Sequence, residues 1–81
     1  MSYTITSHDT NNEIQYLLNL CPVEFTDSLV EAIIFEDNAS ARTAIEERFI
    51  SLCNYISSND IKGIMIAKLK GNKIVREEVF L

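Results

Sequence analysis

The sequence is poor in the residue types that build most catalytic, metal and nucleotide sites. Its 81 residues include one histidine, two glycines, two cysteines, one proline and no tryptophan. Loops that cradle phosphate need glycine-rich turns before a helix, and neither glycine is placed there. Cys21 and Cys53 fit neither a disulfide framework nor a zinc knuckle, so we expect two buried free thiols. We therefore expect no enzyme, no metal site and no cofactor.

Long apolar runs are also missing. No run approaches the roughly 18 apolar residues of a membrane helix, and residues 1–10 have neither the basic region nor the apolar stretch of a signal peptide. We expect a cytoplasmic protein without membrane contact. With 47% apolar residues, the chain is expected to form a single domain over residues 1–81, with a thin core.

Positive charge is absent from the first half of the chain. Residues 1–41 contain seven acids and no lysine or arginine, whereas residues 42–81 contain all seven basic residues and five acids. A net charge of −5 argues against nucleic acid as a partner, because phosphate contacts need a basic surface. An uneven distribution of charge along the chain gives information about binding partners rather than about the fold. Five basic residues share one acid-free stretch, which we interpret as a solvated hairpin: Lys62, Lys68, Lys70, Lys73 and Arg76.

Hydrophobic periodicity predicts several short elements in the first half. Residues 2–6 alternate and predict a strand. Thr10 and Glu13 have the spacing of a capping box, which predicts a short helix over residues 11–20 at a sheet edge. A strand fits the same apolar residues and is the alternative. Residues 28–36 are rich in β-formers and predict a strand with two apolar faces, with a capped helix as the alternative.

The second half predicts one long helix and a hairpin. Residues 39–57 have an apolar stripe at helical spacing behind a cap at Asp37-Asn38, which predicts an amphipathic helix. Residues 61–69 and 73–81 flank Gly71-Asn72, a turn of type II′ that pairs Lys70 with Lys73. This register sets Met65 opposite Glu78 and leaves neither face cleanly apolar, so we expect a β-bulge.

The predicted fold is thus α+β: a small antiparallel sheet, one main amphipathic helix packed on one face and a C-terminal β-hairpin. The residues that we expect to be buried are Ile5, Leu17, Leu29, Ile33, Ile45, Phe49, Leu52, Ile56, Ile64, Ile66 and Val79.

Residues capable of catalysis are not arranged for it. His8 stands between Ser7 and Asp9, but adjacent side chains do not converge into a triad, and we expect an exposed turn histidine. The pairs Glu46–Glu47 and Glu77–Glu78 point apart on a regular element, so we expect solvated faces rather than acid–base partners.

These observations predict a non-enzymatic protein-binding module whose acidic half docks a basic surface of a larger protein. In size and charge the chain looks like the small inhibitor or adaptor proteins of phages and mobile elements, a resemblance that implies no site. The alternative is a dimer, formed through the acidic half and the basic hairpin or through the last strand as a sheet edge. The candidate partner-binding residues are Glu24, Asp27, Glu31, Glu36, Asp37, Ile50 and Tyr55.

Overall fold

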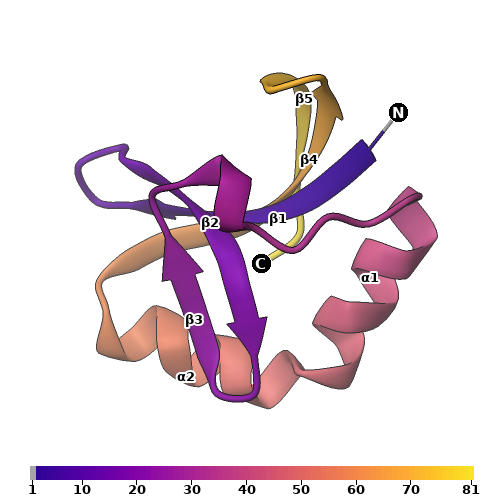
Figure 1. The fold of residues 1–81 in the computed structure, drawn as a ribbon. Coiled ribbons are helices and arrows are strands. Elements are labelled where there is room, and N and C mark those ends of the chain that lie inside the picture. The colour runs from indigo at the N-terminus through magenta and orange to yellow at the C-terminus, as the bar shows by residue number, and fades with distance from the viewer. Residues whose placement is uncertain (1) are drawn as a thin grey trace.

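A computed structural model describes residues 2–81, which form an α+β fold (Figure 1). Within these residues five strands make one antiparallel sheet in the order β3-β2-β1-β4-β5. A 3₁₀ turn, η1 (Leu29–Glu31), leads to two helices that lie along one side of the sheet. The strands are β1 (Ser2–Asp9), β2 (Ile14–Leu20), β3 (Val23–Thr26), β4 (Ile61–Lys70) and β5 (Lys73–Val79), and the helices are α1 (Asn38–Glu47) and α2 (Phe49–Ser58).

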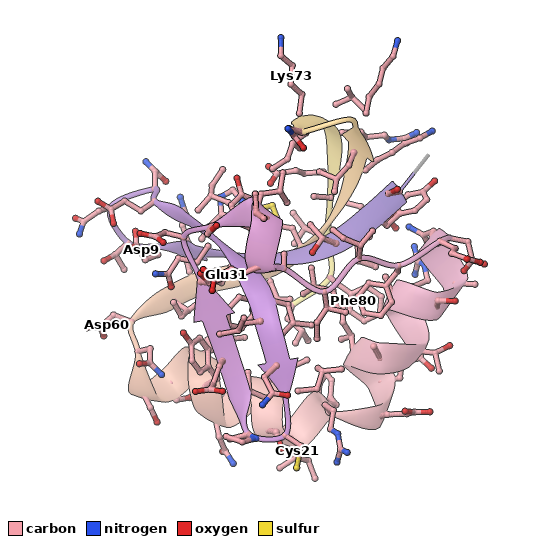
Figure 2. All side chains as sticks on the ribbon, viewed as in Figure 1. Asp9, Cys21, Glu31, Asp60, Lys73 and Phe80 are labelled. Atoms are coloured by element: carbon pink, nitrogen blue, oxygen red, sulfur yellow. The ribbon has the colours of Figure 1, made fainter. Side chains whose placement is uncertain are left out.

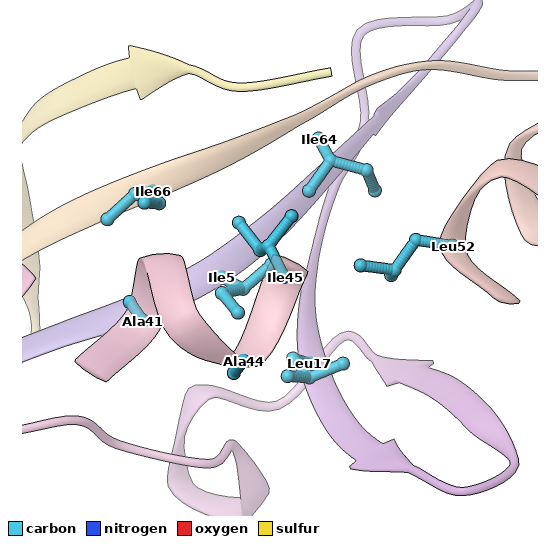
Figure 3. Packing of buried hydrophobic residues seen from close by; sticks show 8 residues of the cluster. All are labelled: Ile5, Leu17, Ala41, Ala44, Ile45, Leu52, Ile64 and Ile66. Atoms are coloured by element: carbon cyan, nitrogen blue, oxygen red, sulfur yellow. The ribbon is translucent and has the colours of Figure 1, made fainter. Parts of the chain in front are cut away.

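The core lies between the sheet and the two helices (Figure 3). Alternate residues of β1 and β4 face the helices, so Ile5 shares one buried cluster with Ile45 of α1 and Leu52 of α2. Six of the predicted core residues are buried, namely Ile5, Leu17, Ile45, Leu52, Ile64 and Ile66, while Leu29, Ile33 and Ile56 are half-buried. The predictions for Phe49 and Val79 are wrong, since these side chains are 47% and 68% exposed.

The segment predicted as one helix over 39–57 forms two helices. Asp37 caps α1 as expected, with its carboxylate accepting a hydrogen bond of 2.7 Å from the backbone N–H of Ser40. The helix ends at Arg48, whose backbone (φ −119°, ψ 26°) is not helical, and α2 begins at the next residue. Because the chain changes direction there, Phe49 leaves the apolar stripe on which its spacing had placed it.

The helix predicted over 11–20 is wrong, and the alternative strand is present as β2. The Asp9 carboxylate accepts hydrogen bonds from the backbone N–H groups of Asn11 (2.8 Å) and Glu13 (2.9 Å), and Asn12 has a φ of 62°. This is the chemistry of a tight turn rather than of a helix start. The turn folds β2 back against β1, with Thr6 opposite Tyr16.

Strand β3 follows directly and was not predicted. It pairs with β2 after a turn at Cys21-Pro22, with Leu20 opposite Val23 and Leu17 opposite Phe25. Both cysteines are free, as expected, but Cys21 lies in this turn and is exposed rather than buried.

The strand predicted over 28–36 is also wrong. After η1 the chain runs extended, and Ile33 donates its N–H to the Leu17 carbonyl (2.8 Å). Phe35 and Tyr3 exchange two backbone hydrogen bonds of 2.9 and 2.7 Å. Strand β2 pairs with β1 only through residues 14–16. Beyond that point, residues 33–35 border the same edge of β1. This segment is rich in β-branched residues, but it makes isolated backbone hydrogen bonds to other parts of the chain instead of forming a regular strand.

The C-terminal hairpin is present with its expected turn and bulge. Gly71 has a φ of 62° while Asn72 is not at positive φ, as in a type II′ turn, and Lys70 pairs with Lys73. A register shift between Lys68 and Leu69 moves Met65 opposite Val79 instead of Glu78. Beyond β5, the N–H groups of Phe80 and Leu81 both donate to the Ile64 carbonyl, at 2.9 and 3.1 Å.

Neither helix found within residues 2–81 has the length and apolar content that crossing a bilayer requires.

Candidate interaction surface

The outward stripe of α2 borders two adjoining hollows. One, of about 370 Å³, lies between α2 and the β2–β3 turn, and the other, of about 330 Å³, lies at the junction of α1 and α2. Ser51 lines both hollows, and we call the residues around them the α2 surface. Its lining residues are Pro22, Val23, Glu46, Glu47, Arg48, Phe49, Ile50, Ser51, Asn54, Tyr55, Ser58 and Asn59.

Two large apolar side chains are exposed on the α2 surface. Ile50 is 76% exposed and Phe49 is 47% exposed, whereas Leu52 on the other side of α2 is fully buried. Glu46 and Glu47 are exposed at the end of α1 and line the same hollow as Ile50. An apolar centre with a charged rim is the usual composition of a protein interface.

Tyr55 forms the wall between α2 and β3. Its ring packs against Phe25, with ring centroids 5.0 Å apart and planes inclined at 33°. Burial raises the pKa of the Tyr55 phenol above its usual value. Of the two α2 residues singled out in the sequence, Tyr55 lines the hollow beside the β2–β3 turn and Ile50 lines the hollow at the junction of the helices.

The five acids singled out in the sequence lie in two separate groups. Glu24 lies in β3, Asp27 directly after it and Glu31 at the end of η1, and the Thr26 hydroxyl donates to the Glu31 carboxylate at 3.5 Å. Because alternate residues of β3 face α2, as Val23 and Phe25 do, Glu24 points to the other side of the hairpin. Figure 2 shows Glu31 in front of the sheet, away from the start of α1.

The second group, Glu36 and Asp37, directly precedes α1. Both residues are exposed. The hydrogen bond from the Ser40 N–H holds the pKa of the Asp37 carboxyl below its usual range. This carboxylate is therefore already committed to capping the helix.

Basic residues gather at the end of the β4–β5 hairpin. Lys68 lies directly opposite Arg76, and Lys70 lies directly opposite Lys73. Lys73 projects from the end of the molecule opposite to Cys21 (Figure 2). Four of the seven basic residues therefore lie together on one hairpin, whereas the acids singled out in the sequence lie in two separate groups.

The two adjacent acids of β5 are exposed, and they bind neighbouring side chains on opposite faces of the sheet. Glu77 accepts a hydrogen bond of 3.0 Å from His8 Nε2, so His8 is a half-buried strand residue and not an exposed turn histidine. Glu78 binds the Arg42 guanidinium and accepts a hydrogen bond from the Asn38 amide at 3.5 Å. Arg42 also lies over the Phe80 ring, 5.3 Å from its centroid.

Residues 2–81 contain no group of three or more histidine, cysteine, aspartate or glutamate side chains placed to share a metal ion. No pattern in the sequence indicated Phe49, Ser51 or Asn54 as surface-site residues, because the hollows depend on β3 and on the break at Arg48. The alternation of Val23 and Phe25 after Pro22 is the signal that would have indicated β3. No family model, curated protein or solved structure matches this chain.

Proposed function

We propose that the chain is a non-enzymatic protein-binding module that uses the α2 surface to dock a basic, partly apolar surface of a larger protein. The observation that carries this proposal is the exposure of Ile50, at 76%, in the hollow at the junction of α1 and α2. Burying one such side chain fully contributes about 1.5–3 kcal/mol, enough to anchor an interface. The rim acids Glu46 and Glu47 favour a partner with lysine or arginine around an aliphatic side chain.

The acids elsewhere act at longer range in this proposal. A net charge of −5 and the group Glu24, Asp27 and Glu31 attract a basic partner during its approach and raise the association rate. A stable interface buries about 800 Å² on each partner, so the docked area extends from Ile50 across α2 to the β2–β3 turn at Pro22. An inhibitor or adaptor of this kind needs shape and charge complementarity and no catalytic group.

The test compares two exposed aliphatic residues on different parts of the molecule. A tagged chain captures its partner from host lysate at low salt, and the purified partner is then titrated against Ile50→Asp and Val30→Asp variants. Val30, in η1, is the matched control because it is 91% exposed and does not line the α2 surface. We expect Ile50→Asp to weaken binding by roughly thirtyfold, as for an interface hot spot, and Val30→Asp to leave it unchanged. Equal affinities of the two variants would exclude the α2 surface.

Charge docking is tested separately. The double variant Glu46→Lys/Glu47→Lys is expected to slow association and to reduce its dependence on salt, because rim charges act mainly on the association rate. A salt dependence identical to that of the unmodified chain would remove the rim acids from the proposal while leaving the role of Ile50 to the first test.

A second candidate function is self-association through β5. Within residues 2–81 this strand pairs only with β4, and Val75 and Val79 on it are 51% and 68% exposed. In an antiparallel pair of two β5 strands centred on Glu77, Arg76 faces Glu78 and Val75 faces Val79 of the second copy. Light scattering at two salt concentrations would find a dimer that Val79→Lys dissociates. A monomer throughout would exclude this candidate.

A further inference from the structure

A small polar pocket of about 180 Å³ lies between the start of α1 and the helix-facing side of β4 and β5. It shares no lining residue with the α2 surface. Strand pairing places Tyr3, Lys68 and Arg76 in one row across β1, β4 and β5. The complete lining is Tyr3, Asn38, Ile66, Lys68, Arg76 and Glu78.

The two cations of this pocket face each other without a counter-ion. Lys68 and Arg76 are direct cross-strand partners, a position where like charges destabilise a sheet. Glu78, the acid of the pocket, is bound to Arg42 and Asn38 on α1. Within residues 2–81, neither Lys68 nor Arg76 forms an ion pair, and the pocket is left with an excess of positive charge.

The start of α1 does not supply the attraction for an anion. The Asp37 carboxylate already accepts the Ser40 N–H and places a negative charge there. The electrostatic attraction comes from Lys68 and Arg76, and the Tyr3 hydroxyl adds a neutral donor that forms no side-chain hydrogen bond within residues 2–81.

We propose that this pocket binds a phosphate group, either as the free ion or as a phosphate monoester on a small molecule. Its volume is below the roughly 300–1,000 Å³ of pockets for drug-sized ligands, which favours a small anion. The Arg76 guanidinium can bind two phosphate oxygens at once, and the Lys68 ammonium supplies a point charge opposite it. A dianion between them converts a repulsive pair into two attractive contacts. No glycine lines this pocket, so it differs from the glycine-rich loops that usually bind phosphate.

The experiment measures the melting temperature in sodium phosphate and in sodium chloride of equal ionic strength. At a phosphate concentration of about ten times Kd, a domain of this size is expected to melt roughly 5 to 10 °C higher. Lys68→Met/Arg76→Met should abolish this rise. Lys70→Met/Lys73→Met is the matched control, because it removes the same charge from a second cross-strand pair of the hairpin, which lies outside the pocket, and it should keep most of the rise.

The comparison between variants decides the matter, since phosphate also stabilises proteins generally by exclusion from their surfaces. An equal rise in all three proteins, or an equal loss in both variants, would overturn the pocket. Amide chemical shifts of the unmodified chain give a readout independent of variant folding: shifts centred on Tyr3, Asn38 and Lys68 support the site, and shifts centred on the Gly71-Asn72 turn contradict it.

The source of the phosphate is distinguished by a second ligand. Tighter binding of O-phosphoserine than of inorganic phosphate indicates a phosphate carried by a larger molecule, and equal binding indicates the free ion. Either result supports the pocket. If neither ligand binds, the phosphate pocket is excluded. The proposal for the α2 surface is not affected by that result, because the two sites share no residue.

Discussion

His8 and Glu77 are joined by a hydrogen bond although their strands, β1 and β5, are separated by β4. The imidazole Nε2 and the carboxylate Oε1 are 3.0 Å apart, and the Thr6 hydroxyl donates to the same oxygen at 3.5 Å. These side chains lie on the face of the sheet opposite Ile5 and the helices, because alternate residues of a strand point to opposite sides. The contact spans β4 on the face that the helices leave uncovered.

We expect this bridge to stabilise the fold measurably. In a double-mutant cycle of His8→Ala and Glu77→Ala, the coupling free energy from urea unfolding should be about 0.5–1 kcal/mol, typical of a partly exposed polar pair. Glu77→Ala should cost more than His8→Ala because it also removes the acceptor of Thr6. Glu46→Ala, at an exposed position without a hydrogen-bond partner in residues 2–81, should change stability by less than about 0.5 kcal/mol. Strict additivity of the two single changes would contradict the bridge.

Ser7→Ala should stabilise the protein. The Ser7 hydroxyl oxygen is buried and finds no hydrogen-bond partner within residues 2–81, which costs about 1–3 kcal/mol relative to a satisfied group. Removing it should raise the free energy of unfolding by about 1 kcal/mol. Thr4→Val is the control on the same strand: its hydroxyl donates to the Ile33 carbonyl at 2.8 Å, so its loss should destabilise by about 1 kcal/mol. A loss of stability in Ser7→Ala would show that this hydroxyl is satisfied.

Gly63→Ala should loosen the last residues of the chain. A Cβ at position 63 would lie 2.9 Å from the Leu81 backbone oxygen, so the segment that bonds to Ile64 must move, at a cost of about 1–3 kcal/mol. Hydrogen exchange at the Phe80 and Leu81 amides should accelerate. Gly71→Ala meets no atom within 4 Å but must adopt a φ near 62°, so it should lower stability without selective exchange at these amides. Unchanged protection at Phe80 and Leu81 in Gly63→Ala would contradict the predicted clash.

The helix cap at Asp37 should make stability depend on pH in the acid range. Its pKa is lowered in the folded protein, so the folded state favours the carboxylate. The resulting stabilisation is complete above the unfolded pKa of about 3.9 and is lost as the pH falls through the folded pKa. Asp37→Asn keeps an acceptor at the cap without the charge. Urea unfolding should find Asp37→Asn less stable than the unmodified chain at pH 7, with a gap that narrows as the pH falls below the unfolded pKa and through the folded pKa. A gap independent of pH would exclude this linkage.

Local patterns in the sequence predict those elements whose partners are close in the chain. The alternation of residues 2–6 and the Gly71-Asn72 turn indicated β1 and the hairpin, and the polar residues on both hairpin faces indicated the bulge. Residues 28–36 were misassigned because Ile33 and Phe35 make single backbone contacts with Leu17 and Tyr3, which no periodicity reports. Strand β3 was missed because its four residues offer a single alternation, that of Val23 and Phe25.

The candidate surfaces, like the fold, could be predicted from the sequence only in part. Ile50 and Tyr55 were predicted as partner-binding residues because they lie off the apolar stripe of the predicted helix. In the structure they line the two hollows of the α2 surface. The hollows themselves arise from the helix break at Arg48 and from β3, neither of which local propensity indicated. The phosphate pocket combines Tyr3, Asn38 and Lys68 from distant parts of the chain, and only the strand pairing brings them together.

The pairing of β1 also sets when this protein can fold. The partners of β1 in β4 are far away along the chain: Asp9 pairs with Ile61 and Ser2 with Leu69, separations of 52 and 67 residues. Its other edge is bordered by β2 at one end and by Phe35 at the other. A long loop must therefore close before β1 can pair with β4, which slows folding relative to a helical bundle of equal length. On the ribosome, β1 can complete this pairing only after residues 61–69 have been synthesised.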